Sequence, residues 1–485
     1  MDSTSSSFHK VAWLFVITYI VGMYLPRLAV EGMFADGLCY AAIARNMAEG
    51  RGTLWEPFFS TSFWLPYNAG SIFYENLPLT FWLQSWFFKI FGDHWWTERI
   101  YCTLLLFGTS FMIVKVWQKA VRQSYKDYAW LPLFLWYGFP RVIWASPNNQ
   151  LDYTEGFFSL SAVYFLITNK NGLSTLNCII AGLITFLALL SKGPVGIFPL
   201  AVPMILWVVF RQTSFPKAVI NTLIVSATFG LALFLLWQYT PAKSWLIHYF
   251  DQQFINAIAG KRETSGEGWT ARLYILPHIL IENAPSFGFV FLFTVFTKKF
   301  YKLKAQNNQT TLLFLLTALA ASLPIMISPK QHEIYLLPAF PFYAMATASF
   351  FMPVFENWEV QFEGHKYLVY WKNGLTIILI GVLTYSGWLY GKPGREEDIL
   401  RDMKRLSVII PVHSKVGVCP TMMSDFVHHC YLQRYHQWEL TTDPSKSRYF
   451  LIQTDCDVKF SQILENKGFV NVKLPNERYE LYQKQ

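Results

Sequence analysis

Long blocks of apolar residues alternate with short polar segments along most of the chain. A helix crosses a hydrocarbon core with about 20 residues, and the blocks are near this length. The first block follows Lys10 and continues without an A-x-A-like cleavage site, so we expect a retained span, with a cleaved signal peptide as the alternative. The pattern predicts about eleven transmembrane helices, at residues 11–30, 98–118, 128–144, 152–168, 176–190, 194–210, 218–239, 284–297, 311–327, 334–353 and 373–390.

Two stretches between the first and second predicted spans have a helical pattern but are not apolar enough to span a membrane. Asp36 to Glu49 has a mixed polar face, and Pro78 to Phe91 is rich in Trp and Phe. Aromatic rings and amphipathic faces are favoured in the plane of the membrane interface. We therefore predict two interfacial helices in this first outer loop.

The character of the sequence changes after Gly391, where a polar tail of about 95 residues begins. Its pattern predicts a helix at 422–435 and strands at 415–419, 449–454, 469–474 and 479–483. The length suits a small independent domain. We expect an all-α polytopic membrane domain at 1–390 and a small extracytoplasmic α/β domain at 391–485.

The composition agrees with a membrane protein. Of the 485 residues, 53% are hydrophobic and only 15% are charged, whereas a soluble domain has about a quarter charged residues. The formal net charge of +9 comes mainly from clusters in short loops between apolar blocks. That distribution is typical of membrane topology and not of a nucleic-acid-binding surface, so no nucleic acid is expected as a partner.

The loop charges also predict the orientation of the chain. If the amino terminus is cytoplasmic, the cytoplasmic loops contain Lys119, Arg122, Lys126, Lys170, Arg211, Lys217, Lys298, Lys299, Lys302, Lys304, Lys366 and Lys372. The short opposite loops contain chiefly Lys192 and Lys330. An excess of Lys and Arg marks the cytoplasmic side, so Lys192 and Lys330 need another reason to lie outside.

Six cysteines, at 39, 102, 178, 419, 430 and 456, are scattered without a C-x-x-C pair. Zinc ribbons and disulfide-rich domains show recurrent cysteine spacings. We therefore expect neither a zinc ribbon nor a disulfide framework.

Ionisable and polar residues at the ends of the predicted spans gather on the outer side of the membrane. They are Asp36, Glu75, Asp152, Lys192, His248, Lys330, His332 and Tyr335. Such groups are costly there unless they are paired or face a water-filled cavity. Together they predict one polar, outward-facing site.

Each of these residues also has a structural explanation. Asp36 and Asp152 suit helix N-caps, and Glu75 suits a solvated loop. Lys192 and Lys330 suit cations that extend to lipid headgroups, while Tyr335 and His248 are common types of interfacial residue. No single spacing is specific, and the shared side of the membrane is what favours function.

Four motifs, in order, resemble the C-type glycosyltransferase superfamily. They are F-A-D-G-L-C-Y-A-A-I-A-R-N-M, Y-E-N-L-P-L-T-F-W-L-Q-S-W-F-F-K-I-F-G, L-S-K-G-P-V-G and S-P-K-Q-H-E-I-Y-L-L-P. More narrowly, residues 10–355 are similar to the bacterial aminoarabinose transferases of lipid A and to protein O-mannosyltransferases. The tail shows no such likeness.

The resemblance implies roles for individual residues. Asp36 matches the family's catalytic base, and Glu75 and His248 match the ligands of an active-site divalent cation such as zinc. Tyr335 matches a tyrosine near the donor. The family pattern E-K-P-P is E-N-L-P here, so Asn76 replaces the lysine that binds donor phosphate.

The chemistry of the family suits these residue types. A sugar on polyprenyl phosphate has a good leaving group, so transfer needs a carboxylate to take the acceptor proton and cations to stabilise phosphate. Asp36 supplies the first, and Lys330, Lys192 or Arg45 the second. His332 and Asp152 are further candidates for the site.

The expected function is therefore an inverting glycosyltransferase of the bacterial inner membrane, active on the extracytoplasmic side. Its expected partners are a polyprenyl-phosphate sugar, membrane lipids, and a lipid A-like, glycan or protein acceptor. A secondary transporter or flippase is the alternative from another class, although polar residues at one face and the lack of related halves disfavour it. A catalytically inactive relative is a third interpretation, motivated by Asn76.

Overall fold

The structure is a computed structural model that describes residues 6–62, 71–167, 173–296, 308–453, 456 and 459–485. It divides into two compact units. Unit 1 comprises Met1–Pro26, Glu75–Thr80 and Cys102–Gly387, and unit 2 comprises Arg27–Tyr74, Phe81–Tyr101 and Trp388–Gln485. The domain boundary between residues 390 and 391 stays a prediction.

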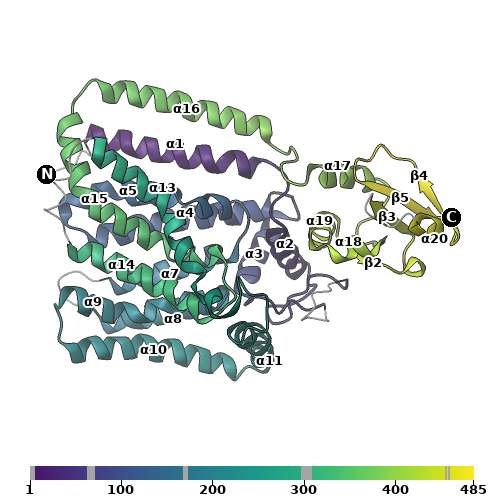
Figure 1. The fold of residues 1–485 in the computed structure, drawn as a ribbon, viewed down its shortest axis with the longest axis horizontal. Coiled ribbons are helices and arrows are strands. Elements are labelled where there is room, and N and C mark those ends of the chain that lie inside the picture. Colours follow the sequence, from purple (N-terminus) through teal and green to yellow (C-terminus); the bar gives the residue numbers. More distant parts are fainter. Residues whose placement is uncertain (1–5, 63–70, 168–172, 297–307, 454–455, 457–458) are drawn as a thin grey trace. The chain divides into compact units, whose positions relative to one another are not determined.

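Unit 1 is a bundle of helices whose long members run in similar directions (Figure 1). The longer helices are α1 (Ser7–Ala29), α4 (Thr97–Ala120), α7 (Leu151–Leu166), α8 (Thr175–Ser191), α10 (Phe215–Trp237), α13 (Ile275–Phe296), α14 (Asn308–Ser322), α15 (Phe340–Phe362) and α16 (Tyr367–Leu389). Shorter elements are η1 (Gln123–Ala129), α5 (Trp130–Tyr137), α6 (Pro140–Ala145), η2 (Pro194–Ala201), α9 (Val202–Phe210), α11 (Thr240–Tyr249), η3 (Phe250–Ile255), α12 (Asn256–Ile258), η4 (Gly268–Leu273), η6 (Leu323–Ile327) and η7 (Glu333–Leu336). The predicted helical class is therefore confirmed for this part of the chain.

The count of eleven spans is not confirmed. In the described residues, six helical segments are long and apolar enough to cross a membrane: Ser7–Ala29, Thr97–Ala120, Phe215–Trp237, Gly268–Phe296, Gln309–Ile327 and Tyr367–Leu389. Six such segments make the chain a multi-pass membrane protein. The basic clusters expected at 298–304 and at Lys170 lie outside the described residues.

Proline residues alter two of the predicted spans. The predicted span 128–144 consists of η1, α5 and α6, and Pro140 is the first residue of α6. The predicted span 194–210 consists of η2 and α9, with Pro199 inside η2. A proline lacks the N–H of a helical bond and restricts the residue before it. The first block is therefore interrupted between Tyr137 and Pro140, whereas the second runs without a gap from Pro194 to Phe210 and begins as a 3-10 helix.

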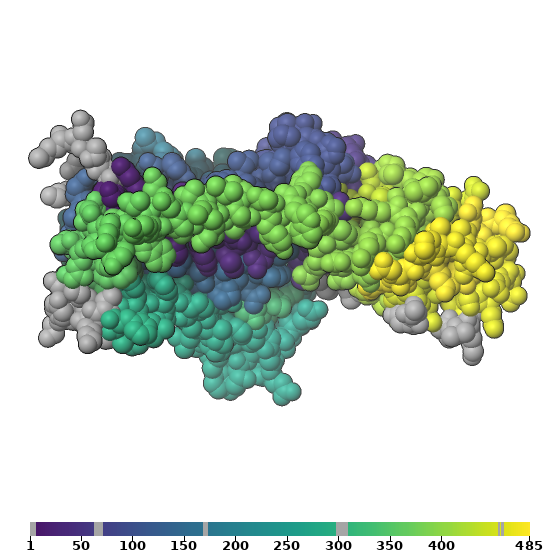
Figure 2. All heavy atoms as spheres, turned by 90° about the horizontal axis from the view of Figure 1, so that it is seen from above, coloured from purple at the N-terminus to yellow at the C-terminus, as the bar shows by residue number. Residues whose placement is uncertain are grey.

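The outer helices of unit 1 expose apolar side chains. On α10, Phe234 and Leu235 are each 60% exposed, and on α16, Ile377 is 70% exposed. Figure 2 shows α16 on the surface beside α1, where a Cβ on Gly22 would meet Val382 at 3.7 Å. Apolar faces of this kind are stable in lipid.

Unit 2 combines helices from the first outer loop with the tail. Its elements are α2 (Ala35–Ala48), α3 (Leu79–Phe91), α17 (Glu397–Leu406), α18 (Pro420–Ser424), α19 (Phe426–His436), η8 (Pro444–Lys446), α20 (Lys459–Glu465), and strands β1 (Lys415–Val418), β2 (Glu439–Thr441), β3 (Tyr449–Gln453), β4 (Phe469–Val472) and β5 (Tyr479–Lys484). The two helices predicted in the outer loop are present as α2 and α3. Their interfacial position stays a prediction.

The five strands form one mixed sheet in the order β2-β1-β3-β5-β4. Strand β1 pairs in parallel with β2 and β3, and β5 pairs antiparallel with β3 and β4. A Cβ on Gly417 would lie 2.0 Å from the Phe450 ring, so only glycine fits at this position of β1. The predicted small α/β fold of the tail is confirmed.

The cysteine spacing indicated no disulfide framework, but the structure contains one disulfide. Cys419, just after β1, is bonded to Cys456, 37 residues later. The parallel pairing of β1 with β3 brings the ends of both strands to one edge of the sheet, where the cysteines meet. The spacing of the cysteines in the sequence does not predict which of them are bonded.

Candidate active site

Lys192 lies at the centre of a buried polar cluster in unit 1. It follows the last residue of α8, and its ammonium group donates to the Asp152 carboxylate in the first turn of α7. The same ammonium lies 4.3 Å from the centre of the Tyr335 ring. Three residues predicted for the site are therefore brought together.

Tyr249 of α11 connects this cluster to its surroundings. Its hydroxyl donates to the Lys192 carbonyl at 3.1 Å. A Cβ on Gly193 would lie 2.7 Å from that hydroxyl oxygen, so glycine permits the close approach. Burial raises the pKa of Tyr249, so its hydroxyl remains a hydrogen-bond donor at neutral pH.

Glu155, one helical turn after Asp152, was missed by sequence reasoning. One carboxylate oxygen accepts from the Gly196 N–H at 2.8 Å. The side chain is fully buried, and among the described residues its other oxygen has no hydrogen-bond partner. Spacing of three residues places Asp152 and Glu155 on one face of α7; that spacing was a signal in the sequence.

A second part of the cluster surrounds Glu75. The Thr80 hydroxyl donates to the Ser191 carbonyl at 2.9 Å and ties the Glu75–Thr80 segment to the end of α8. The Glu75 carboxylate lies 3.4 Å from the Arg262 guanidinium, and the two side chains are 9% and 12% exposed. Arg262 also donates to Gln253. Sequence reasoning missed Arg262, which is 187 residues from Glu75.

Lys330 is held in place by its backbone neighbours. The N–H of Gln331 donates to the Ser265 hydroxyl at 2.7 Å, and the N–H of Ser265 donates to the Pro329 carbonyl at 3.0 Å. Gln331 is fully buried and its side chain donates to the Arg272 carbonyl at 2.8 Å. The short loop that carries Lys330 is therefore fixed.

The ammonium of Lys330 is less tightly paired than the other two cations. Its nearest carboxylate is Glu263, at 3.9 Å, and the Glu263 side chain is 82% exposed. Burial lowers the pKa of Lys330, and the positive charge of Arg262 lowers it further. Arg262 and Lys192 thus both lie within electrostatic reach of Lys330.

His332 packs edge-on against Tyr335, with 5.6 Å between the ring centres. Burial and the nearby Lys330 ammonium lower the pKa of His332. The imidazole is therefore neutral at pH 7, where it can donate or accept a hydrogen bond but adds no charge.

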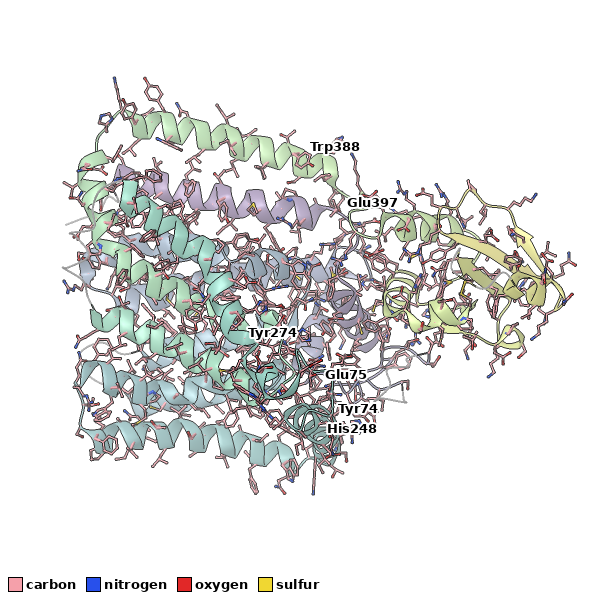
Figure 3. All side chains as sticks on the ribbon, viewed as in Figure 1. Tyr74, Glu75, His248, Tyr274, Trp388 and Glu397 are labelled. Atoms are coloured by element: carbon pink, nitrogen blue, oxygen red, sulfur yellow. A yellow bond between two sulfur atoms is a disulfide. The ribbon has the colours of Figure 1, made fainter. Side chains whose placement is uncertain are left out.

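Glu75, His248 and Tyr274 lie at the same end of the unit 1 bundle (Figure 3). The described residues do not fit a bound metal ion, because no three His, Cys, Asp or Glu side chains among them are grouped as ligands. A catalytic zinc usually has three protein ligands. The carboxylate of Glu75 instead faces the Arg262 guanidinium.

Tyr274 belongs to a separate charged cluster that sequence reasoning also missed. Arg141 of α6 lies 3.5 Å from Glu282 of α13 and 3.4 Å from Glu333 of η7. The Tyr274 hydroxyl donates to the Glu333 carboxylate. Nδ1 of His278 lies 3.7 Å from the same carboxylate. These contacts join α6, α13 and η7.

In unit 2, Asp36 lies in the first turn of α2. The N-cap residue of that helix is Phe34, and no side chain caps the helix there. Asp36 is therefore not the N-cap, although a carboxylate in the first turn favours the helix dipole. Its side chain is half-buried, whereas most of α2 is buried.

The chain before α2 is held by the segment that follows α16. The N–H of Glu31 donates to the Lys392 carbonyl at 2.8 Å, and the N–H of Gly394 donates to the Glu31 carbonyl at 2.9 Å. Gly32 has a φ of 85°, a conformation that favours glycine. The position of Asp36 is therefore set by residues from two of the three segments of unit 2.

Arg45, predicted to bind the donor, is occupied inside unit 2. It donates to the backbone carbonyls of Gln433 and Arg434 at 3.0 Å each. The side chain is 1% exposed and lies 3.7 Å from Asp93. Burial lowers the pKa of Arg45 to about 10. These contacts favour a structural role for Arg45; its donor-binding role stays a prediction.

The chain was compared with protein families, with curated proteins and with solved structures, and matches were found among the solved structures. No protein-family model and no curated protein sequence matches the chain. Among solved structures, ArnT from Cupriavidus metallidurans bound to undecaprenyl phosphate matches with a TM-score of 0.60 and 15% identity, covering 97% of each chain. The apo form of that ArnT matches with a TM-score of 0.59, 15% identity and the same coverage.

The archaeal oligosaccharyltransferase AglB from Archaeoglobus fulgidus, in complex with an inhibitory peptide and a dolichol-phosphate, also matches. Its TM-score is 0.50 at 11% identity, and the match covers 98% of this chain and 74% of AglB. Identities this low show a shared fold. Over nearly its whole length, the chain therefore has the fold of ArnT, which is that of the C-type glycosyltransferases.

Proposed function

We propose that the protein is an integral membrane glycosyltransferase that moves a sugar from a polyprenyl-phosphate donor to a hydroxyl acceptor. The main support for this proposal is the structural match to ArnT, which covers 97% of both chains. That ArnT structure contains undecaprenyl phosphate, and the AglB structure contains a dolichol-phosphate. The shared fold favours this enzyme over a transporter or flippase.

The cations of unit 1 are suited to the donor phosphate. Lys192 and Arg262 are each paired with one carboxylate, whereas Lys330 is paired only with an exposed one. A buried and incompletely neutralised ammonium favours an anion. Lys330 and Arg262 therefore replace the charge that Asn76 lacks, which supports an active enzyme over an inactive relative. His332 and Tyr335 follow Lys330 closely in the chain and pack against each other. Asp152 accepts a hydrogen bond from Lys192 and positions it.

Asp36 is proposed to take the proton of the acceptor hydroxyl. The hydroxyl oxygen attacks the anomeric carbon as the bond to the phosphate oxygen breaks, and the proton passes to the Asp36 carboxylate. The phosphate departs as an anion, so no general acid is needed. A single displacement inverts the anomeric centre. No step uses a metal ion, because the residues around Glu75 do not fit one.

The reaction is placed on the extracytoplasmic side of a bacterial cell membrane. The Lys and Arg bias of the loops supports this orientation. The Cys419–Cys456 bond in unit 2 also supports it, because disulfides persist mainly in oxidising compartments. The acceptor is a lipid A-like glycolipid, another envelope glycan or a protein hydroxyl.

The donor can be identified in cells that lack the protein. A deletion strain should accumulate the unused lipid-linked sugar, and mass spectrometry of extracted lipids should name it. The purified protein should then release the polyprenyl phosphate from that lipid when acceptor is added. An Asp36→Asn protein should not, whereas Asp127→Asn, which changes an exposed acid, should retain activity. Transport of the lipid without sugar transfer contradicts the proposal.

The side of the membrane is tested by labelling. Ser445 and Lys366 are both exposed, and every cysteine outside the disulfide is buried. An impermeant maleimide applied to intact cells should label Ser445→Cys and spare Lys366→Cys. The reverse pattern contradicts the extracytoplasmic placement.

A further inference from the structure

Two cysteines of unit 2 lie together outside the Cys419–Cys456 bond. Cys39 is on α2 and Cys430 is on α19, and their side chains form a hydrogen bond. Both are fully buried. Cys102 and Cys178 are in unit 1, on α4 and α8. Unit 2 therefore contains a second pair of neighbouring cysteines, which the structure holds as free thiols.

Contacts on both sides fix the two helices against each other. The Tyr431 hydroxyl donates to the Met33 carbonyl at 3.0 Å. Arg45 binds the Gln433 and Arg434 carbonyls at the end of α19. Gln433 in turn donates to the Phe59 carbonyl at 2.8 Å. The contact between the thiols is thus part of a tightly packed interface inside unit 2.

We propose that Cys39 and Cys430 are joined as a second disulfide in the native protein, which links α2 covalently to α19. The proposal rests on the extracytoplasmic placement of unit 2, where the first disulfide also forms. A disulfide-bearing thiol oxidoreductase is the oxidant. One cysteine attacks it as a thiolate to give a mixed disulfide, and the second cysteine displaces the oxidant's thiol. Two electrons and two protons pass to the oxidant, which leaves as a dithiol.

The bond forms during folding, before the two helices close. In the folded unit, burial raises the pKa of Cys430 well above its ordinary value, and the thiolate is the reactive form. Both sulfur atoms are also inaccessible to an oxidoreductase after closure. The same burial protects the finished bond from reductants, so it is a structural link and not a switch.

The link acts on the helix that carries the proposed base. Asp36 lies one turn before Cys39 on α2, and its negative charge is felt at Cys430. The Cys419–Cys456 bond lies wholly within the tail, whereas the second bond joins the outer-loop segment to the tail. It would hold α2 in unit 2 when the tail fluctuates.

A thiol count on the full-length protein tests the proposal. Cells are quenched with acid to trap thiols, and the protein is denatured without reductant and reacted with a maleimide-polyethylene glycol. Four of the cysteines lie outside the Cys419–Cys456 bond. If Cys39 and Cys430 are bonded, only Cys102 and Cys178 react, which gives two labels. Four labels on most of the protein overturn the proposal.

Single substitutions give a second readout through the sign of the change. Cys430→Ser should raise the count from two to three, because it releases Cys39; without the bond it lowers the count from four to three. Cys39→Ser should behave alike. Cys178→Ser is the matched control and lowers the count in both cases. Because the protein is denatured for labelling, the result does not require the variants to be active, and it is independent of glycosyl transfer.

Discussion

The two units treat buried charge in different ways. In unit 2, the Arg434 guanidinium lies 2.7 Å from both Glu98 and Asp93 and donates to the His94 carbonyl at 2.7 Å. In unit 1, the one ion pair of Lys330 among the described residues is with the exposed Glu263, at 3.9 Å. Four of the five N–H donors of the Arg434 guanidinium are used in these contacts of unit 2, so it has little capacity left for a ligand. The difference separates charge that stabilises a fold from charge that is available for substrate.

The surroundings of the units differ in the same sense. Helices α10 and α16 of unit 1 expose large apolar side chains, as lipid-facing helices do. The tail of unit 2 combines a mixed sheet with helices and a disulfide, whereas α3 of the same unit exposes Trp86 and Ile90. Polar groups buried in a unit with lipid-facing helices are costly, and the proposed donor binding gives them a role.

The largest effect is expected from breaking the Arg434 network. Arg434→Ala leaves Glu98 buried without its partner and should cost about 3 to 5 kcal/mol in the stability of unit 2. Hydrogen exchange of peptides from α19 and the sheet, followed by mass spectrometry, measures this loss. Arg448→Ala, which changes an exposed arginine of the same unit, should change stability by less than about 0.5 kcal/mol. Equal effects would erase the contrast between the two units.

The next effect concerns catalysis. Asp36→Asn keeps the size of the side chain but removes the base, so turnover should fall by about 100-fold or more. Exchange in α2 should stay as in the unchanged protein, because Asp36 is not the N-cap. Near-normal turnover of the Asn protein would reduce Asp36 to a first-turn acid that favours the helix dipole.

A smaller effect is expected at the least tightly paired cation. A charge-assisted contact to phosphate is worth about 1.5 to 3 kcal/mol, so Lys330→Ala should lower kcat/KM for the donor by roughly 10- to 100-fold. Lys330→Arg should keep part of the activity, and Asn76→Lys should restore some of it in the alanine background. Lys366→Ala, at an exposed position, is the control. Unchanged donor kinetics in Lys330→Ala would move the assignment to Arg262 or Lys192.

The smallest effect is a shift with pH. Burial lowers the pKa of Lys330, so its charge is lost at a lower pH than that of an ordinary lysine, near 10.4. Because donor binding needs the charged form, kcat/KM should fall as pH rises through that lowered pKa. Lys330→Arg stays charged, so its alkaline decline should begin at higher pH. Superimposable profiles would show that another group sets the decline.

The sequence was informative about the fold wherever one pattern was repeated over a long stretch. The apolar blocks at α1, α4, α10 and α16 have boundaries within a few residues of those predicted. The prediction of the sheet lacked strand β2, because β2 has only three residues and shows no alternation of apolar and polar positions. Pro140 was a visible break, and Pro199 lies inside a 3-10 turn; hydropathy alone predicts neither.

The candidate site was less predictable because its contacts are distant in sequence. The grouping of Asp152, Lys192 and Tyr335 agrees with the shared outer side that the topology implied. The pairing of Glu75 with Arg262 spans 187 residues, and no local pattern contains such a contact. The occupied state of Arg45 likewise depends on α19, whose backbone carbonyls carry no sequence signature.

The segmented make-up of unit 2 has a consequence for biosynthesis. Arg45 of α2 and its partner Gln433 are 388 residues apart, so a ribosome adding about 5 to 20 residues per second needs roughly 20 to 80 s between them. During that interval α2 has none of its α19 contacts. A nascent or truncated chain therefore holds the cation cluster of unit 1 before the helix bearing Asp36 is secured. We therefore expect α2 to become fixed in unit 2 only after α19 has been synthesised.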